Sequence, residues 1–553
     1  FGLTFLLYFS ISYMGERDAT IERIVLTEYR HAIVWFNLKI LGIYLALALT
    51  LGLFAAWLRL TRTGEILLWN GGVWLTAWLH AIKVYPGLFV DQLYAKGGLH
   101  RLFQLGITDY LPLVLIDGLF LVAVGWLGWA RRRRLAAGTF ILLCVLWSVP
   151  WPVRAVRPDW CDPQKPNVLI LATDSLRPDR LGINGYSRPT PHIDRLLAEG
   201  GNFLNARSSL ARTFSSFTSI LTSRFPPDHG IRHMFPRPEE VESRWQTLPE
   251  AFNQAGYATS LTSDFSGDIF ARQGYGFSRI QAPHLTLPNL IKQRSLEFHY
   301  FLLAFLIHPP GRTLFPVMNL MPLGIEPRYV TRGSQQAIAK ALAEGRPFFH
   351  LYFSSNNHFP YGSRAPYYRM FADRAYRGPY KYRKVDMMKR ASGYDVPEAD
   401  RNQVNALYDG ATRLFDDQVG EMLSFLERCG VRQNTILVIM SDHGESLYED
   451  GYGSARRSLA WSPFQRHGLR SLVPPGRVCR PADRPDRPGH RHRPHRARTG
   501  RLARPHPVRR RLLAAGAARG LVRWPARLPG DRDLVYSRHP LYRGPYPHSL
   551  PRH

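Results

Sequence analysis

Cysteine is scarce in this chain of 553 residues, and the four that occur lie far apart, at Cys144, Cys161, Cys429 and Cys479. None of them forms the CxxC spacing that zinc ribbons and redox motifs require, so the sequence predicts no disulfide framework. With 45% hydrophobic and 12% aromatic residues, the chain is also too long and too apolar for a disordered tail or one small domain.

Lysine and glutamate are absent from Ser454–His553, which contains 24 Arg, 15 Pro and 4 Asp. This segment carries two thirds of the formal net charge of +30, so the basic pI does not indicate nucleic-acid binding. The change of composition after Gly453 is unlike a final strand and helix. We interpret it as a reading-frame shift, with a natural basic disordered tail as the alternative. Read one base later, codons compatible with Gly453–His467 can encode a segment that begins ARHGDH.

Several runs in the N-terminal third are apolar enough to cross a membrane. Ile40–Leu58 has 19 residues without a charge, and at about 1.5 Å per residue it covers a hydrocarbon core of about 30 Å. Leu111–Ala130 and Leu135–Trp151 are two further runs. Phe1–Tyr13 resembles the remnant of another, so we expect that the true N-terminus precedes Phe1.

Four consecutive arginines at positions 131–134 predict the orientation of these runs. The positive-inside rule places them in the cytoplasm, so the chain after Trp151 lies outside the membrane. A weaker run, Ile66–Ile82, supplies one more crossing, and an interfacial helix is its alternative. Asp117 marks either a polar pathway or a contact with another helix. The sequence thus predicts about five spans in residues 1–151, a linker at 152–166 and an extracytoplasmic domain from residue 167.

Three apolar, β-branched runs in the second half end in possible metal ligands. NVLILATD ends at Asp174, NTILVIM precedes Asp442 and His443, and FFHLYFS precedes an Asn-Asn-His sequence that contains His358. Such runs are typical of buried parallel strands. Together with the helical patterns between them, they predict an α/β sandwich with a mostly parallel central sheet. These helical patterns cover Ile193–Glu199, Thr247–Ala255, Gly333–Ala343 and Ala406–Arg428.

Carboxylate and imidazole side chains at one edge of such a sheet suit a divalent metal, Zn²⁺ or Mn²⁺. Taken singly, an Asp after a strand is more often a cap or turn residue, and Asp-His-Gly is a turn. The combination of the three strand ends favours the metal site. Asp264, which ends another apolar stretch, is interpreted as a turn residue.

The string NVLILATDSLRPDRLGINGYSRPTPHIDRLLAEGGNFLNARSS resembles the opening of the catalytic domain in the sulfatase-like branch of the alkaline phosphatase superfamily. TLPEAFNQAGYATSLTSD and SDHGESLYEDG resemble later landmarks of that domain. The resemblance covers about Asn167–Gly453 and implies an alkaline-phosphatase-like fold. With predicted spans before it, the domain is similar to membrane-bound phosphoethanolamine transferases and lipoteichoic acid synthases.

The resemblance implies that Thr213 is the nucleophile and a metal ligand. Sulfatases carry a Cys-x-Pro-x-Arg motif whose first residue, Cys or Ser, is oxidised to formylglycine. Here Thr213 stands at the modified position, Ser215 replaces the proline and Phe217 replaces the arginine, so formylglycine is not expected. The transferases use threonine at this place to form a phosphothreonine intermediate, and a metal can bind the hydroxyl as alkoxide. Ser215 or Ser216 as nucleophile, or a purely structural Thr213, are the alternatives.

The remaining site residues also follow from the resemblance. Asp174 corresponds to the first acidic ligand, although glutamate is commoner in the transferases, and Asp442 and His443 correspond to the Asp-His ligand pair. His358 resembles the histidine that contacts the transferred phosphate group, with a capped loop residue as its alternative. Arg212 stays outside the predicted site. A further metal-site histidine, usual shortly after DHGE, is missing from its expected loop.

We therefore expect a multi-pass enzyme of the bacterial inner membrane with its catalytic domain on the periplasmic or extracytoplasmic side. It would transfer a phosphate-linked head group from a membrane phospholipid to an envelope glycan or lipid acceptor, with divalent Zn or Mn as cofactor and no nucleic-acid partner. A sulfatase-type or phosphodiesterase-type hydrolase is the second hypothesis. A non-catalytic, lipid-sensing membrane protein is the third, and it could dispense with Thr213 and the metal ligands.

Overall fold

The computed structural model describes most of residues 30–448, with gaps that include 65–74, 131–137, 143–151, 319–326 and 385–395. The chain divides into two units between Asp483 and Arg484, and all described residues belong to the first. The expected remnant span at Phe1–Tyr13, most of Leu135–Trp151 and the Arg/Pro-rich tail at residues 454–553 lie outside the described residues.

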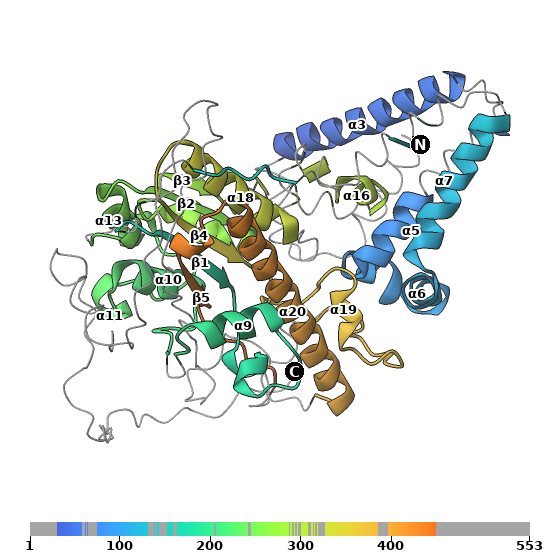
Figure 1. Ribbon diagram of the computed structural model, residues 1–553. Coiled ribbons are helices and arrows are strands. Elements are labelled where there is room, and N and C mark those ends of the chain that lie inside the picture. The colour runs from blue at the N-terminus through green and yellow to red at the C-terminus, as the bar shows by residue number, and fades with distance from the viewer. Residues whose placement is uncertain are drawn as a thin grey trace, which may run out of the picture. The chain divides into compact units, whose positions relative to one another are not determined.

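A five-stranded sheet, in the order β3-β2-β4-β1-β5, forms the centre of the half of the described chain that begins at Asn167. Every neighbouring pair is parallel, so the prediction of a mostly parallel sheet is confirmed. The three strands expected from the sequence are β1, β4 and β5, which lie side by side in the middle and at one edge (Figure 1). The strands are β1 (Asn167–Thr173), β2 (Ala258–Ser263), β3 (Arg279–Gln281), β4 (Phe348–Ser354) and β5 (Thr435–Met440).

Helices cover both faces of the sheet because its side chains alternate between two apolar cores. Leu169 and Leu171 of β1 belong to the core that includes α9 (Pro191–Glu199), α18 (Pro327–Ala343) and α20 (Glu398–Arg428). Val168 and Ile170 belong to the opposite core, with α10 (Thr213–Thr222) and α14 (Asp268–Gln273). The result is a three-layer α/β/α sandwich, in which α20 is the long helix crossing Figure 1.

The four helices expected in this half are found, with bounds shifted by a few residues. They are α9, α13 (Leu248–Gln254), α18 and α20. α13 begins with a capping box, in which Thr247 Oγ1 accepts from Glu250 N–H and the Glu250 carboxylate accepts from Thr247 N–H. The shorter helices are α11 (Pro226–His229), α12 (Pro238–Val241), α16 (Tyr300–Leu306) and α19 (Tyr367–Met370).

Four helices form the described part of the N-terminal region: α3 (Arg30–Trp57), α5 (Leu75–Val84), α6 (Gly98–Leu105) and α7 (Leu113–Ala130). The expected spans at Ile40–Leu58, Ile66–Ile82 and Leu111–Ala130 fall wholly or partly in α3, α5 and α7. Within the part of the chain that the structure describes, no helix has the length and apolarity needed to cross a membrane. The five spans remain a prediction.

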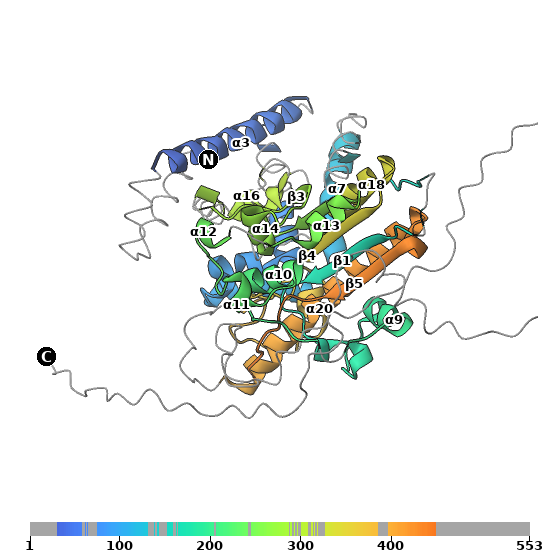
Figure 2. The same cartoon turned by 90° about the vertical axis from the view of Figure 1, so that its left-hand side faces the viewer.

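The order of the strands positions the site. β1 pairs with β4 on one side and with β5 on the other, so the carboxyl ends of these three parallel strands meet at one edge (Figures 1 and 2). The segments that follow them therefore converge, and they carry Asp174, His358, Asp442 and His443.

Candidate active site

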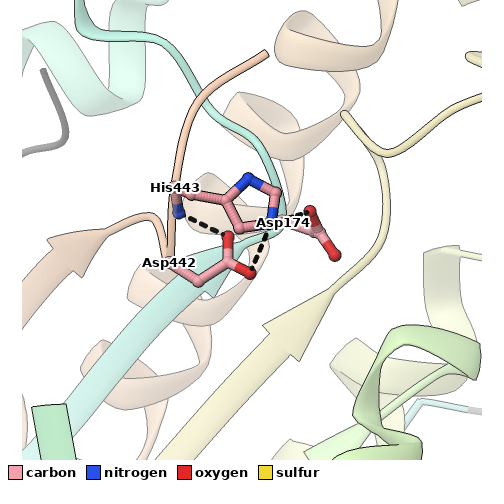
Figure 3. A group of neighbouring side chains, drawn as sticks. All are labelled: Asp174, Asp442 and His443. Atoms are coloured by element: carbon pink, nitrogen blue, oxygen red, sulfur yellow. Dashed lines mark hydrogen bonds and ion pairs between the residues drawn. The ribbon is translucent and has the colours of Figure 1, made fainter. Parts of the chain in front are cut away.

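Two carboxylates and one imidazole meet at the carboxyl edge of the sheet. Asp174 directly follows β1, and Asp442 and His443 follow β5 after Ser441. One ligand atom from each lies within 4.8 Å of the other two (Figure 3). His443 Nε2 is 3.4 Å from Asp442 Oδ2 and 3.7 Å from Asp174 Oδ1. All three residues are buried.

Thr213 is the first residue of α10 and joins this group. Arg212 before it has extended backbone angles, so the helix begins where the chain reaches the site. The Thr213 hydroxyl lies 3.2 Å from His443 Nε2 and donates to Asp174 Oδ2 at 3.5 Å. The partial positive charge at a helix N-terminus favours an anionic oxygen at this position. The structure thus brings together the four residues that the sequence predicts as nucleophile and ligands.

Ser175 holds the two carboxylates in place, and the sequence reasoning missed it. Its hydroxyl donates to Asp174 Oδ1 at 2.8 Å, and its N–H donates to Asp442 Oδ1 at 3.1 Å. Its carbonyl accepts from the Tyr408 hydroxyl at 2.6 Å. Ser175 has a φ of 61°, a left-handed conformation that is uncommon for serine. No spacing in the sequence signals this role, because the contacts come from a single tight turn after β1.

The electrostatics of the group reflect burial of like charges. Burial raises the pKa of Asp442 to about 6, and the negative charge of Asp174 adds to the increase. Burial by itself lowers the pKa of His443, but the carboxylates of Asp442 and Asp174 reverse this effect and raise it above its usual value. Positive charge at this place therefore stabilises the buried carboxylates.

The donor set fits a divalent metal ion. Asp442 Oδ2 is buried and, among the described residues, has no hydrogen-bond partner. The His443 imidazole lies 3.4 Å from this oxygen, but the carboxylates of Asp442 and Asp174 share that one imidazole, and buried charge is costly unless it is paired. Two carboxylates and an imidazole are ligands that Zn²⁺ and Mn²⁺ accept. Asp174, Asp442 and His443 would hold the ion, and the Thr213 hydroxyl lies beside them.

His358 lies at the margin of the site rather than in its four-residue centre. Its Nδ1 donates to the carbonyl oxygen of Phe359 at 2.6 Å, and its ring packs edge-on against Phe265. Burial raises the pKa of Glu445, while the nearby positive charges of Lys384, His358 and His443 oppose the increase. His358 is therefore in electrostatic reach of Glu445.

Lys384 is a second residue that the sequence reasoning missed. It is buried, and its ammonium lies 4.7 Å from the centre of the Tyr448 ring. It comes from an irregular loop, where neither helical nor strand periodicity exists to mark a lysine as buried. The buried ammonium of Lys384 therefore places a positive charge near Glu445, at this margin of the site.

The alternative nucleophiles are committed to structural hydrogen bonds. The Ser215 hydroxyl donates to the Ile231 carbonyl at 2.7 Å, and the Ser216 hydroxyl donates to the Asp442 carbonyl at 2.6 Å. Phe217 is buried in an aromatic cluster, with ring centres 4.8 Å from Phe270 and 4.7 Å from Phe353. Thr213 is thus the hydroxyl of this helix start that contacts both His443 and Asp174.

Asp264 behaves as the turn residue expected from the sequence. It directly follows β2, and its carboxylate accepts from the N–H groups of Ser266 and Ser355. Its two backbone partners join the ends of β2 and β4. This carboxylate therefore supports the sheet edge next to the site.

Comparison with known proteins gives one family and several distant relatives. The family model described as Sulfatase matches residues 166–472, more than half of the chain. The ulvan-active sulfatase of Formosa agariphila is 25% identical over 305 residues, which cover 54% of this chain and 54% of that protein. The chain thus spans about half the length of this curated relative.

Two solved structures are also similar. The phosphonate monoester hydrolase of Agrobacterium radiobacter matches at 20% identity, with a TM-score of 0.35 and coverage of 51% of this chain and 63% of that one. The C-terminal periplasmic domain of EcEptC from Escherichia coli, solved in complex with Zn, matches at 16% identity, with a TM-score of 0.34 and coverage of 57% and 72%.

Proposed function

This chain belongs to the sulfatase family, in the sulfatase-like branch of the alkaline phosphatase superfamily, and from that premise we propose that it is a membrane-bound, metal-dependent transferase. It moves a phosphate-linked head group from a phospholipid to an envelope glycan or lipid through a phosphothreonine intermediate at Thr213. The observation that carries this proposal is the Thr213 hydroxyl, 3.2 Å from His443 Nε2 and 3.5 Å from Asp174 Oδ2.

Two features support phosphoryl transfer over sulfate ester hydrolysis. The residue at the modified position of a sulfatase is threonine, which the formylglycine pathway does not use. Phe217 stands where the sulfatase motif has arginine, and it is packed among Phe270 and Phe353 instead of facing the site. A threonine oxygen that attacks phosphorus directly requires neither formylglycine nor that arginine.

The chemistry divides into two displacements. In the first, Thr213 Oγ1 bonds to phosphorus, the bond from phosphorus to the glycerol oxygen breaks, and diacylglycerol leaves with a proton on that oxygen. In the second, an acceptor hydroxyl bonds to phosphorus, the bond from phosphorus to Thr213 Oγ1 breaks, and the proton of the acceptor hydroxyl passes to Thr213 Oγ1. A divalent cation supplies the positive charge that makes the deprotonated threonine accessible near neutral pH.

The residues of this chain prepare the first displacement. Asp174 accepts from the Thr213 hydroxyl and so orients its lone pairs, while Ser175 fixes the Asp174 carboxylate through a 2.8 Å hydrogen bond. The buried ammonium of Lys384 adds positive charge at the margin near Glu445, where a phosphodiester anion would approach. Zn²⁺ or Mn²⁺ is the ion that we expect in the site.

The membrane location rests mainly on the sequence, through the apolar runs at Ile40–Leu58 and Leu111–Ala130. The exposed surface of α3 supports it, because Leu45, Leu49 and Leu53 are exposed at intervals of four residues and so lie along one side of the helix. Such a row calls for an apolar partner. We propose the bacterial inner membrane, with the catalytic domain on its outer side.

Intact-protein mass spectrometry tests the nucleophile directly. The full chain is incubated with vesicles of phosphatidylethanolamine and phosphatidylglycerol, with and without Mn²⁺ or Zn²⁺. We expect a head-group phosphate adduct on Thr213, and release of diacylglycerol, in the presence of the metal. Thr213→Ala should abolish both, and Thr213→Ser, which keeps a hydroxyl, should retain the adduct. Turnover that persists in Thr213→Ala would refute the assignment.

The same experiment separates a transferase from a hydrolase. If water resolves the adduct, free phosphorylated head group accumulates without any added acceptor. If a sugar hydroxyl is required, the adduct persists until a glycan or lipid A-like acceptor is added.

A further inference from the structure

α6 (Gly98–Leu105) has its apolar side chains on the outside. Leu99, Leu102 and Phe103 are 82%, 64% and 40% exposed, and their spacing of three and four residues places them on one face. Gln104 and Leu105, on the opposite side, are buried. A helix on the surface of a water-soluble protein has the reverse arrangement, with its apolar face toward the core.

Specific contacts fix α6 in this orientation. The Gln104 side-chain amide donates to the Pro86 carbonyl at 2.9 Å, and Arg101 Nε donates to the Tyr94 carbonyl at 3.1 Å. The Arg101 guanidinium also lies over the Tyr94 ring, 4.7 Å from its centre. Because its polar residues are used to hold the helix against the protein, the outward face is left to leucine and phenylalanine.

The apolar face of α6 continues onto its neighbours. The Phe103 ring stacks on Trp78 of α5, with ring centres 5.3 Å apart. Tyr110, which precedes α7, and Val114 and Leu115, at the beginning of α7, are also exposed. Figure 1 shows α6 beside α5 and α7, the helices that overlap two predicted spans.

Charge near α6 favours an anionic partner. Lys96 and His100 are exposed beside the apolar face. The two aspartates of the same segment have basic partners: Asp91, which is exposed, pairs with Arg383 at 2.6 Å, and Asp109 lies 3.8 Å from Lys381. Basic residues around an inserted apolar face are the pattern of interfacial helices on anionic lipid.

We propose that α6 lies in the head-group layer of an anionic phospholipid bilayer, with Leu99, Leu102 and Phe103 inserted among the lipid chains. The proposal rests on the proposed function in one respect, the membrane location of the chain. It adds that α6 is the element that keeps the loop between His358 and Lys384 at the lipid surface.

The segment that carries α6 is bonded to the loop between His358 and Lys384. The Ala365 N–H donates to the Val84 carbonyl at 2.8 Å, and the hydroxyls of Thr108 and Tyr382 are 2.7 Å apart. Lys384, at the end of that loop, is the buried cation at the margin of the site, with its ammonium 4.7 Å from the centre of the Tyr448 ring. Insertion of α6 would therefore keep this margin of the site close to the phospholipid head groups.

Photocrosslinking of the full chain in vesicles tests the docking. p-Benzoylphenylalanine is introduced at position 102 or, as the matched control, at position 225, where Phe225 is 62% exposed in the catalytic half. The vesicles contain phosphatidylethanolamine and phosphatidylglycerol, and adducts are identified by mass spectrometry. We expect lipid adducts at position 102 and not at position 225, with phosphatidylglycerol above its mole fraction. The proposal would be overturned if position 102 gave no lipid adducts, or no more than position 225. If the adducts matched the mole fractions of the two lipids, the preference for anionic lipid would be wrong.

A kinetic measurement distinguishes this inference from the proposed function. Leu102→Ser should raise the KM for bilayer phospholipid about tenfold, because the leucine side chain that inserts into the lipid is lost. Phe225→Ser should leave the KM unchanged. An unchanged KM in Leu102→Ser contradicts the docking. If no variant and no parent protein turns over lipid, the transferase proposal fails, and the crosslinks alone then decide whether α6 binds the bilayer.

Discussion

Two clusters of one histidine and two aspartates occur among the described residues, and they differ in what surrounds them. The first is Asp174, Asp442 and His443 at the carboxyl edge of the sheet. The second is His192 on α9 with Asp416 and Asp417 on α20. Burial raises the pKa of both Asp442 and Asp416 to about 6. By residue type and proximity alone, each could hold a metal.

The second cluster already has its donors and its cation. Asp416 Oδ1 accepts from the Ile193 N–H at 2.8 Å, which caps the beginning of α9. The Arg413 guanidinium lies 3.0 Å from Asp417 and 3.8 Å from Asp416, and Asp417 also accepts from the Tyr367 hydroxyl. Asp416 Oδ2, like Asp442 Oδ2, has no hydrogen-bond partner among the described residues, but here an arginine that is always charged lies beside both carboxylates.

The first cluster has a different environment. After burial, the strongest influence on the Asp442 pKa is repulsion by Asp174, whereas for Asp416 it is the hydrogen bond from Ile193. A reactive hydroxyl, Thr213, adjoins the first cluster, while an arginine adjoins the second. The two clusters therefore differ in the hydroxyl that adjoins the first and in the arginine that adjoins the second, and not in their ligand types.

The largest effect that this comparison predicts is on metal content and activity. Asp442→Ala should reduce turnover by roughly 10³-fold or more, since a ligand of the divalent metal ion is lost. Asp416→Ala should keep both the metal and the turnover at 20 °C. Metal is measured by mass spectrometry of the ions bound after dialysis. If Asp416→Ala lost as much bound metal and turnover as Asp442→Ala, the two clusters would not differ in function as described here.

The second effect is on stability. Asp416→Ala removes the acceptor for the Ile193 N–H and leaves Arg413 with one carboxylate partner fewer. A buried donor without its acceptor costs about 1–3 kcal/mol, and the loss of a helix cap falls in the same range. We expect urea unfolding, followed by circular dichroism, to show a free energy of unfolding lower by about 2–3 kcal/mol. A change below about 0.5 kcal/mol would mean that Asp416 is not the structural cap described here.

The sequence alone predicts the strands and helices whose apolar residues form a regular pattern. β1, β4 and β5 are continuous apolar runs with strand length, and their carboxyl ends must converge once the sheet is parallel. That convergence is why the sequence alone predicts that Asp174, Asp442 and His443 lie at one site. Thr213 required the family resemblance, because a Ser/Thr-rich helix start has no distinctive pattern of its own.

The remaining site residues and contacts depend on tertiary structure, which no repeating pattern in the sequence predicts. Ser175 acts through backbone and hydroxyl groups of one left-handed turn, and Lys384 is buried by a loop. The hydrogen bond from the Ile193 N–H to Asp416 depends on the placement of α9 against α20, which brings together residues that lie far apart in the sequence. The bonding of residues 84–109 to residues 365–383 is of the same kind.

A smaller stability effect is expected at Gly420. A Cβ added there would lie 2.7 Å from the His192 imidazole, because the ring packs directly on this glycine of α20. Forcing a side chain apart from its neighbour typically costs about 1–3 kcal/mol, and the half-buried ring can move to reduce this. Because alanine is favoured over glycine in a helix interior by about 1 kcal/mol, which offsets part of this cost, we expect Gly420→Ala to lower the free energy of unfolding by about 1 kcal/mol in the same urea measurement. An increase in stability would indicate that the ring is not held against α20.

The smallest effect, and the sharpest test of the comparison, is expected at His192. If the second cluster is structural, the imidazole only packs against Gly420 and contributes to the charge near Asp416. His192→Ala should then cost about 1 kcal/mol or less, and the bound metal should remain at the parent level. It should also abolish the penalty of Gly420→Ala, since the ring that the new methyl group meets is gone. If instead His192→Ala lowers the metal content by one ion per chain while Asp442→Ala lowers it by another, both clusters bind metal. In that case the arginine beside Asp416 and Asp417 would not be sufficient compensation, and the charge argument that separates the two sites would be wrong.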